Sequence, residues 1–93
     1  MRIDWLIWDD WNVAHIAEHG VTPEEVEEVC EASRHIARRA AMTDYGQTRY
    51  RLYGQTYEGR YLFVVLDKIE AGSFYVVTAR DMTERERRNY RRR

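Results

Sequence analysis

The chain has 93 residues, enough for one compact domain but not for two, so we expect a single domain over residues 1–93. Charged residues make up 33% of the chain, yet no apolar run approaches the roughly 20 residues that cross a membrane, and the acidic N-terminal segment does not resemble a signal peptide. Cys30 is the only cysteine, which excludes an internal disulfide and a multi-cysteine zinc site. We therefore expect a cytoplasmic protein with no membrane partner.

The net charge of −1 conceals an uneven distribution. Residues 1–33 carry nine acidic side chains and one arginine, a net charge of −8, whereas residues 34–93 carry fourteen basic and seven acidic side chains, a net charge of +7. Nearly all of the positive charge is arginine, whose planar guanidinium binds phosphate bidentately. The second part of the chain therefore predicts a basic, phosphate-attracting surface, although a solvated helix face with a basic tail explains the same pattern.

The N-terminal third predicts a strand followed by a helix. Residues 3–8 are rich in aromatic and β-branched side chains, which is typical of a strand. Asp9 or Asp10 offers an N-cap for the helix, and Gly20 offers a stop. The predicted buried positions of this helix, at helical spacing, are Val13, Ile16 and Ala17.

A second helix is predicted from Thr22 to about Ser33. Thr22 caps it, Pro23 occupies the first helical position, and Glu25 completes a capping box. The predicted buried stripe consists of Val26, Val29 and Cys30. Its place in this stripe indicates that Cys30 is a small core residue and not a nucleophile.

The second part of the chain predicts an antiparallel meander and a last helix. The expected strands cover residues 35–41, 49–55, 60–67 and 73–80, with tight turns over 56–59 and 70–72. Thr83 and Glu86 repeat the capping box, so a short basic helix is expected from Glu84 to about Arg91. The predicted class is α+β, a small antiparallel sheet in β-α-α-β-β-β-β-α order with helices packed on it.

Short motifs run in a fixed order through nearly the whole chain. They are Trp8-Asp9, His19-Gly20-Val21, Arg49 five residues before Gly54, Gly59-Arg60, Ala79-Arg80, and Glu86-Arg87 followed by Tyr90. In this order and spacing they resemble the BrnT family of bacterial toxins. Two positions that are commonly basic in the family are Asn12 and Glu18 here.

The resemblance implies a RelE-like fold and an endoribonuclease that blocks translation by cleaving RNA. It also implies a neighbouring antitoxin with a DNA-binding ribbon-helix-helix domain, with which the toxin forms a hetero-oligomer.

Metal-independent RNA cleavage needs a base for the 2′-hydroxyl, positive charge for the phosphorane and a proton donor for the leaving oxygen. We expect Arg49, Arg60 and Arg80, on or at the ends of consecutive strands, to form a phosphate clamp if they share one sheet face. The sequence does not give the hairpin registers. The alternative is that these arginines pair with acidic side chains or are solvated.

His19 and Tyr90 are the candidates for proton transfer, with helix capping and helix packing as their respective alternatives. Further RNA contacts are predicted at Arg51, Arg87, Arg88 and Arg91. No metal or other cofactor is expected. His15 to His19 match the H-x-x-E-H pattern, but the chain offers no clear third zinc ligand.

Two classes of function remain open at this point. The first is an endoribonuclease toxin. The second is a catalytically silent domain that binds an antitoxin or RNA in a regulatory role.

Overall fold

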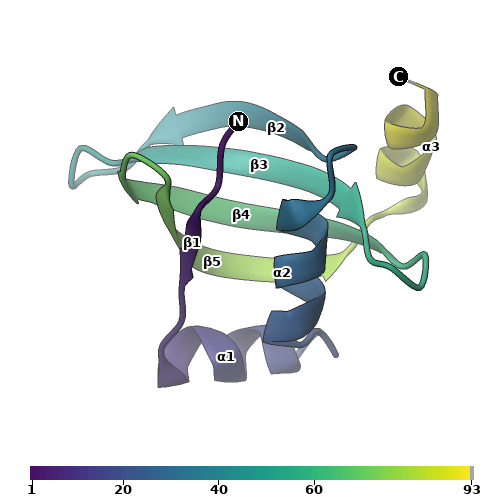
Figure 1. Ribbon diagram of the computed structural model, residues 1–93, viewed down its shortest axis with the longest axis horizontal. Coiled ribbons are helices and arrows are strands. Elements are labelled where there is room, and N and C mark those ends of the chain that lie inside the picture. Colours follow the sequence, from purple (N-terminus) through teal and green to yellow (C-terminus); the bar gives the residue numbers. More distant parts are fainter. Residues whose placement is uncertain (93) are drawn as a thin grey trace.

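The computed structural model describes residues 1–92, and its elements follow the predicted order (Figure 1). The strands are β1 (Trp5–Ile7), β2 (Ile36–Met42), β3 (Thr48–Gln55), β4 (Tyr61–Glu70) and β5 (Ser73–Asp81). The helices are α1 (Asp10–Ala17), α2 (Pro23–Glu31) and α3 (Glu84–Arg92). The α+β class and the order of elements are confirmed. Within residues 1–92, each helix is too short or too polar to span a bilayer.

All five strands form one mixed sheet in the order β1-β5-β4-β3-β2. Strands β2 to β5 make the predicted antiparallel meander, but β1 pairs in parallel with β5. The prediction of an antiparallel sheet is therefore wrong at this edge. Tight turns in the sequence specify hairpins between neighbouring strands, whereas a parallel pair depends on a long connection that leaves no local signal.

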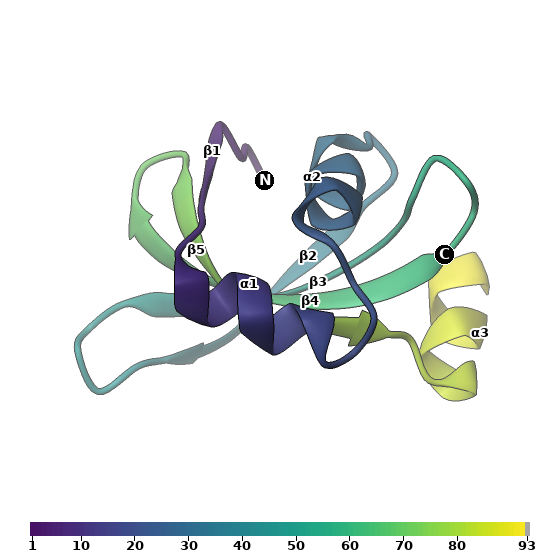
Figure 2. The same cartoon turned by 90° about the horizontal axis from the view of Figure 1, so that it is seen from below.

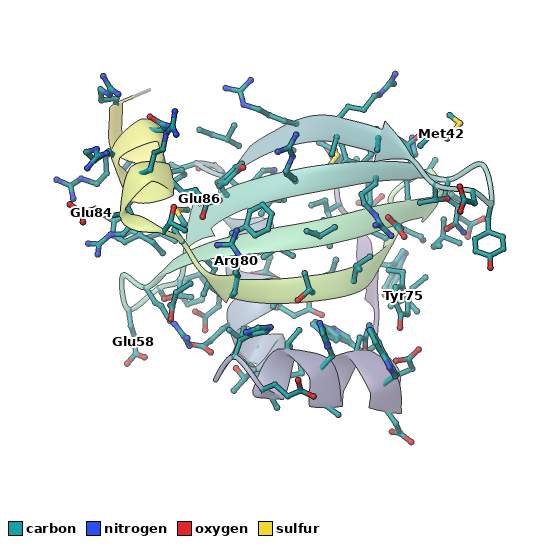
Figure 3. All side chains as sticks on the ribbon, turned by 180° about the vertical axis from the view of Figure 1, so that it is seen from behind. Met42, Glu58, Tyr75, Arg80, Glu84 and Glu86 are labelled. Carbon is teal, nitrogen blue, oxygen red and sulfur yellow. The ribbon has the colours of Figure 1, made fainter. Side chains whose placement is uncertain are left out.

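The sheet has a covered face and an open face. Figure 2 shows α2 and the N-terminal segment on one side of the sheet, with α2 against β3 and β4. Helix α1 runs along the β5 edge (Figure 1), and its Ile16 joins the same core. The fully buried hydrophobic side chains of this layer include Ile16, Val26, Val29, Leu52, Leu62, Val64, Leu66 and Val76. Helix α3 lies at one end of the sheet, where Phe63, Met82 and Tyr90 form a second, smaller cluster. Within residues 1–92, no helix covers the rest of the second face (Figure 3).

Helix α2 begins and packs as predicted. Thr22 and Glu25 form the capping box, and Pro23 occupies the first turn. Cys30 is 6% exposed in the core, and burial raises its pKa to about 12. The thiol is therefore protonated at neutral pH, which agrees with a packing role.

Helix α1 is rotated relative to the prediction. Ile16 is buried, but Val13 and Ala17 are exposed, and Asn12 is fully buried in their place. The Asn12 amide donates hydrogen bonds of 3.0 Å to the carbonyls of Ile7 and Val76, and its oxygen completes a capping box with Asp9. Because the buried amide of Asn12 has all of these partners, it fixes the orientation of α1 on β1 and β5. These hydrogen bonds outweigh the apolar spacing from which the buried face of the helix was predicted.

Candidate functional site

The open face of the sheet collects arginines from three strands. The register places Arg38 of β2 opposite Arg51 of β3, and Arg51 opposite Val65 of β4. Opposite residues in a sheet point to the same side, and every second residue of a strand does so too. By this alternation the polar and aromatic side chains of the open face include Arg38, Arg49, Arg51, Tyr53, Phe63, Asp67, Tyr75 and Arg80. Figure 3 views this face, with α3 along one end.

Arg38 and Arg51 are exposed neighbours of the same charge. Among residues 1–92, neither guanidinium forms an ion pair with a carboxylate. Like charges directly opposite each other across a strand pair repel, so a bound anion would stabilise this arrangement. Both arginines line a hollow of about 340 Å³ between the sheet and α3, together with Ile36, Tyr53, Glu86, Asn89 and Tyr90.

Arg80 of β5 is held at the α3 end of the same face. Its guanidinium carbon lies 4.2 Å from the centre of the Phe63 ring. Its two terminal nitrogens donate to the Glu86 carboxylate at 2.9 and 3.1 Å, and Figure 3 shows the two side chains meeting. The hydrogen bonds from Arg80 lower the pKa of Glu86. Glu86 therefore neutralises part of the charge that Arg80 would present to a ligand.

Arg49 lies on the open face but at its other end. It forms a bidentate ion pair with Asp67, with nitrogen–oxygen distances of 2.7 and 2.9 Å. Asp67 is four residues from Phe63 along β4, and Phe63 faces Arg80. This separation is about 13 Å along the strand. Arg49 and Arg80 therefore share a face without sharing a pocket.

Arg60 lies on the covered side, so the expected convergence of Arg49, Arg60 and Arg80 is not found. Its Nη1 donates to the Gly20 carbonyl at 2.8 Å and to Glu25 at 3.1 Å, and its Nε donates to Asp81 at 2.7 Å. The hydrogen bond to Asp81 raises the pKa of Arg60, and the same bond lowers the pKa of Asp81. Arg60 thus joins the α1–α2 loop to the end of β5. This agrees with the alternative interpretation from the sequence, in which the arginine pairs with acidic side chains of the protein itself.

His19 follows α1 and is exposed in the helix layer. Its ring meets the edge of the His15 ring at 5.7 Å, and its backbone carbonyl lies 3.4 Å from Nη2 of Arg60. It therefore lies with Arg60 and not with the arginines of the open face. Within residues 1–92, no three His, Cys, Asp or Glu side chains are grouped so that they could hold a metal ion.

Tyr90 is 6% exposed and anchors α3 to the rest of the molecule. Its hydroxyl donates to the backbone carbonyl of Arg34 at 3.2 Å, and its ring packs edge-on against Tyr61. These contacts match helix packing, which the sequence offered as the alternative to proton transfer by Tyr90. The ring nevertheless borders the hollow that contains Arg38 and Arg51.

The other predicted RNA contacts divide between two places. Arg51 lies in the central hollow, whereas Arg87, Arg88 and Arg91 lie on exposed parts of α3. Arg87 stacks over Tyr61 at 4.7 Å, beside Arg60, and Arg88 is 3.5 Å from Glu84. None of these three α3 side chains lines the hollow that contains Arg38 and Arg51.

Sequence reasoning missed Arg38, Glu86 and Asn89 as parts of the site. Arg38 lies two residues after Ile36, and this period-two spacing predicts that both face one side of a strand. Glu86 was recognised as a capping residue and as part of the Glu86-Arg87 motif, but not as a partner of Arg80. Its pairing with Arg80 depends on where α3 lies against the sheet, which no local pattern gives.

A family model described as "Ribonuclease toxin, BrnT, of type II toxin-antitoxin system" matches residues 8–86. A search of curated proteins found no match. The matched range includes strands β2 to β5 and the first turn of α3. It therefore contains Arg38, Arg51, Arg80 and Glu86.

Proposed function

Because the chain belongs to the BrnT family of ribonuclease toxins of type II toxin–antitoxin systems, we propose that it cleaves RNA on the open face of its sheet, without a metal ion. The ribose 2′-hydroxyl attacks the adjacent phosphate, giving a 2′,3′-cyclic phosphate and a free 5′-hydroxyl. The observation that carries this proposal is the Arg38–Arg51 pair, two exposed guanidiniums opposite each other and without a carboxylate partner within residues 1–92.

In this proposal, Arg38 and Arg51 bind the backbone phosphate and hold it over the hollow. Two guanidiniums supply the positive charge that the phosphorane oxygens need as they gain negative charge, and such charge stabilisation is often the largest catalytic contribution. Tyr53, between them and α3, offers a ring on which a neighbouring base stacks.

Arg80 and Glu86 act together in the chemical step. A phosphate on the open face competes with Glu86 for the Arg80 guanidinium. When Arg80 turns to the phosphate, the cause of the lowered pKa of Glu86 is removed, and the carboxylate becomes a better base for the 2′-hydroxyl. The leaving 5′-oxygen takes its proton from water.

The remaining predicted residues have other roles in this proposal. Arg49 is neutralised by Asp67, and Arg60 holds the fold together. Arg87, Arg88 and Arg91 extend the positive potential along α3 and attract RNA at longer range. We further propose, from the family resemblance, that the protein has a RelE-like fold, acts in the cytoplasm and is bound by an antitoxin with a ribbon-helix-helix domain.

The test compares Arg38→Ala/Arg51→Ala with a control on the same strand. Arg39 is exposed and pairs with Tyr50, which packs against the core, so Arg39 lies on the other side of β2. The wild type should slow growth and cut single-stranded RNA in the presence of chelator. The double variant should lose at least about 10²-fold in cleavage rate, whereas Arg39→Ala should keep it. A harmless wild type that leaves RNA intact would instead favour a silent binding domain.

A further inference from the structure

A second hollow lies on the open face, at the end away from α3, and the proposed chemistry does not use it. Its volume is about 620 Å³, which is in the range of sites for small molecules. Figure 3 shows Met42 and Tyr75, which line it, at the end of the sheet away from α3. Arg49, Asp67 and the connection between β2 and β3 also line it.

Arg49 is held in one orientation in this hollow. Its Nε and Nη2 donate to the two oxygens of Asp67 at 2.7 and 2.9 Å. The side chain of Asp67 is 10% exposed, whereas that of Arg49 is 40% exposed. A guanidinium has five N–H groups, and the three that this ion pair leaves have no acceptor within residues 1–92. One of them on Nη1 and one on Nη2 point outward side by side, so they form a free pair of parallel donors.

The charge of the hollow favours a base over a phosphate. Arg49 and Asp67 neutralise each other, whereas phosphate binding depends on uncompensated positive charge, which Arg38 and Arg51 supply. Two parallel donors instead match a neutral ligand with two adjacent acceptors. Guanine presents such a pair at O6 and N7, whereas adenine has a donor at N6, and uracil and cytosine lack the pair on the corresponding edge. Arginine on O6 and N7 of guanine is the commonest specific contact to a base.

The hollow lies next to the proposed phosphate site. Arg49 and Arg51 are two residues apart on β3, about 7 Å, and both face the open side. Arg51 is opposite Arg38, but Arg49 is opposite Ala41, whose small side chain leaves room beside the guanidinium. A base that binds Arg49 can therefore belong to a nucleotide whose own phosphate lies on Arg38 and Arg51.

Two tyrosines add aromatic surface to the hollow. Tyr75 pairs with Asp67 in the sheet register, and its hydroxyl donates to the Asp9 carboxylate at 3.0 Å, so its ring is held in place. Tyr45, in the connection between β2 and β3, is 91% exposed. Unstacked RNA bases bind to proteins by stacking on such rings while hydrogen bonds read their edges. The hollow offers both kinds of contact.

We propose that this hollow binds a guanine base of the RNA, with O6 and N7 accepting the two outward N–H groups of Arg49. The scissile phosphate is then one of the two attached to that guanosine, so the hollow selects the bond that is cut. This inference rests on the proposed function, which places the phosphate on Arg38 and Arg51. Because Asp67 fixes Arg49 before RNA binds, little side-chain freedom is lost when the base enters.

The first test changes the base and leaves the protein as it is. The probes are short uridine RNAs that carry one guanosine, adenosine, inosine or 7-deazaguanosine. Inosine keeps both O6 and N7, whereas 7-deazaguanosine lacks N7. The guanosine and inosine RNAs should be cut at least about tenfold faster than the adenosine RNA, at a bond next to the purine. The 7-deazaguanosine RNA should be cut about tenfold more slowly than the guanosine RNA, because one charge-assisted bond is lost. Equal rates for guanosine and adenosine, or for guanosine and 7-deazaguanosine, overturn the inference.

The second test changes the protein. Arg49→Lys keeps the positive charge but removes the pair of parallel donors, so the ratio of guanosine to adenosine cleavage should fall to near one. The matched control is Arg38→Lys on the same face, which should slow the cleavage of all four RNAs and keep that ratio. A merely structural role of Arg49 would lower all rates together, so an unchanged ratio in folded Arg49→Lys overturns the inference. Should this variant not fold, the base analogues still decide the question with the wild type.

A binding measurement separates failure of this inference from failure of the proposed function. The same RNAs with 2′-O-methyl groups cannot be cut, because the attacking hydroxyl is blocked, and their binding is measured by anisotropy. If the wild type does not cut RNA, the proposed function fails, but the guanosine RNA should still bind at least about tenfold more tightly than the adenosine RNA. A wild type that cuts RNA without regard to the base overturns the guanine site and leaves the proposed function standing.

Discussion

Glu86 takes part in two interactions at once. Its carboxylate accepts a hydrogen bond of 2.9 Å from the backbone nitrogen of Thr83, which completes the cap of α3, and it also accepts both bonds from Arg80. The first interaction stabilises the helix, and the second withholds positive charge from the open face. A substitution at this one residue therefore changes stability, RNA affinity and chemistry in different directions.

Glu86→Gln should bind RNA more tightly and cut it more slowly. The amide cannot neutralise Arg80, so the guanidinium becomes available to phosphate, and we expect affinity to rise about tenfold, the value of one charge-assisted contact. The amide also cannot accept a proton, so single-turnover cleavage should fall by about 10²-fold or more. RNA anisotropy and quenched-flow cleavage measure the two effects. Glu84→Gln, on the same exposed turn, is the control, and an unchanged cleavage rate would remove Glu86 from the mechanism.

The same carboxylate makes stability depend on pH. The folded protein lowers the pKa of Glu86, chiefly through the hydrogen bonds from Arg80, so the pair stabilises the fold above the unfolded-state pKa of about 4.3. This stabilisation is lost as the pH falls through the lowered folded-state pKa. Glu86→Gln should therefore cost about 1 kcal/mol of unfolding free energy at pH 7, and the difference should shrink as the pH approaches 3. Urea titrations at a series of pH values measure it, and a constant difference would contradict the assignment.

At the scale of elements, sequence patterns predicted what is local and missed what depends on packing. The capping boxes at Thr22 and Thr83 start their helices as expected, because their hydrogen bonds lie within four residues. The parallel position of β1 and the buried amide of Asn12 depend on contacts with β5, which is more than 60 residues away. The arginines of the candidate site could not be assigned from the sequence for the same reason, because strand register decides on which side of the sheet each arginine lies.

Arg60 connects three elements of the fold, because it bonds to the α1–α2 loop, to α2 and to the end of β5. Arg60→Ala leaves Glu25 and Asp81 without their main partner and removes a hydrogen bond to the α1–α2 loop. Because these groups are partly exposed, the expected loss is about 1–2 kcal/mol, which lowers the melting temperature by about 5–15 °C in a domain of this size. RNA cleavage measured well below that temperature should be unchanged. A folded variant without activity would return Arg60 to the catalytic group, where the sequence first placed it.

The whole molecule separates its charges between two layers. Helix α2 carries Glu24, Glu27, Glu28 and Glu31, whereas the open face and α3 carry most of the arginines. This division follows the sequence, in which the acidic residues are concentrated before residue 34. An acidic layer on one side and a basic face on the other orient an approaching polyanion, so RNA meets the open face first.

RNA binding by this protein should therefore be strongly salt-dependent, and the dependence should come from the open face. Each phosphate contact on single-stranded RNA contributes about −0.7 to the slope of the logarithm of the binding constant against the logarithm of salt concentration. Arg38→Ala should make that slope shallower by about 0.7, because it removes a phosphate contact. Arg39→Ala, which removes the same charge from the other side of β2, should leave the slope nearly unchanged. Equal slopes for the two variants would mean that only net charge attracts RNA, and the placement of the site on the open face would then have lost its electrostatic support.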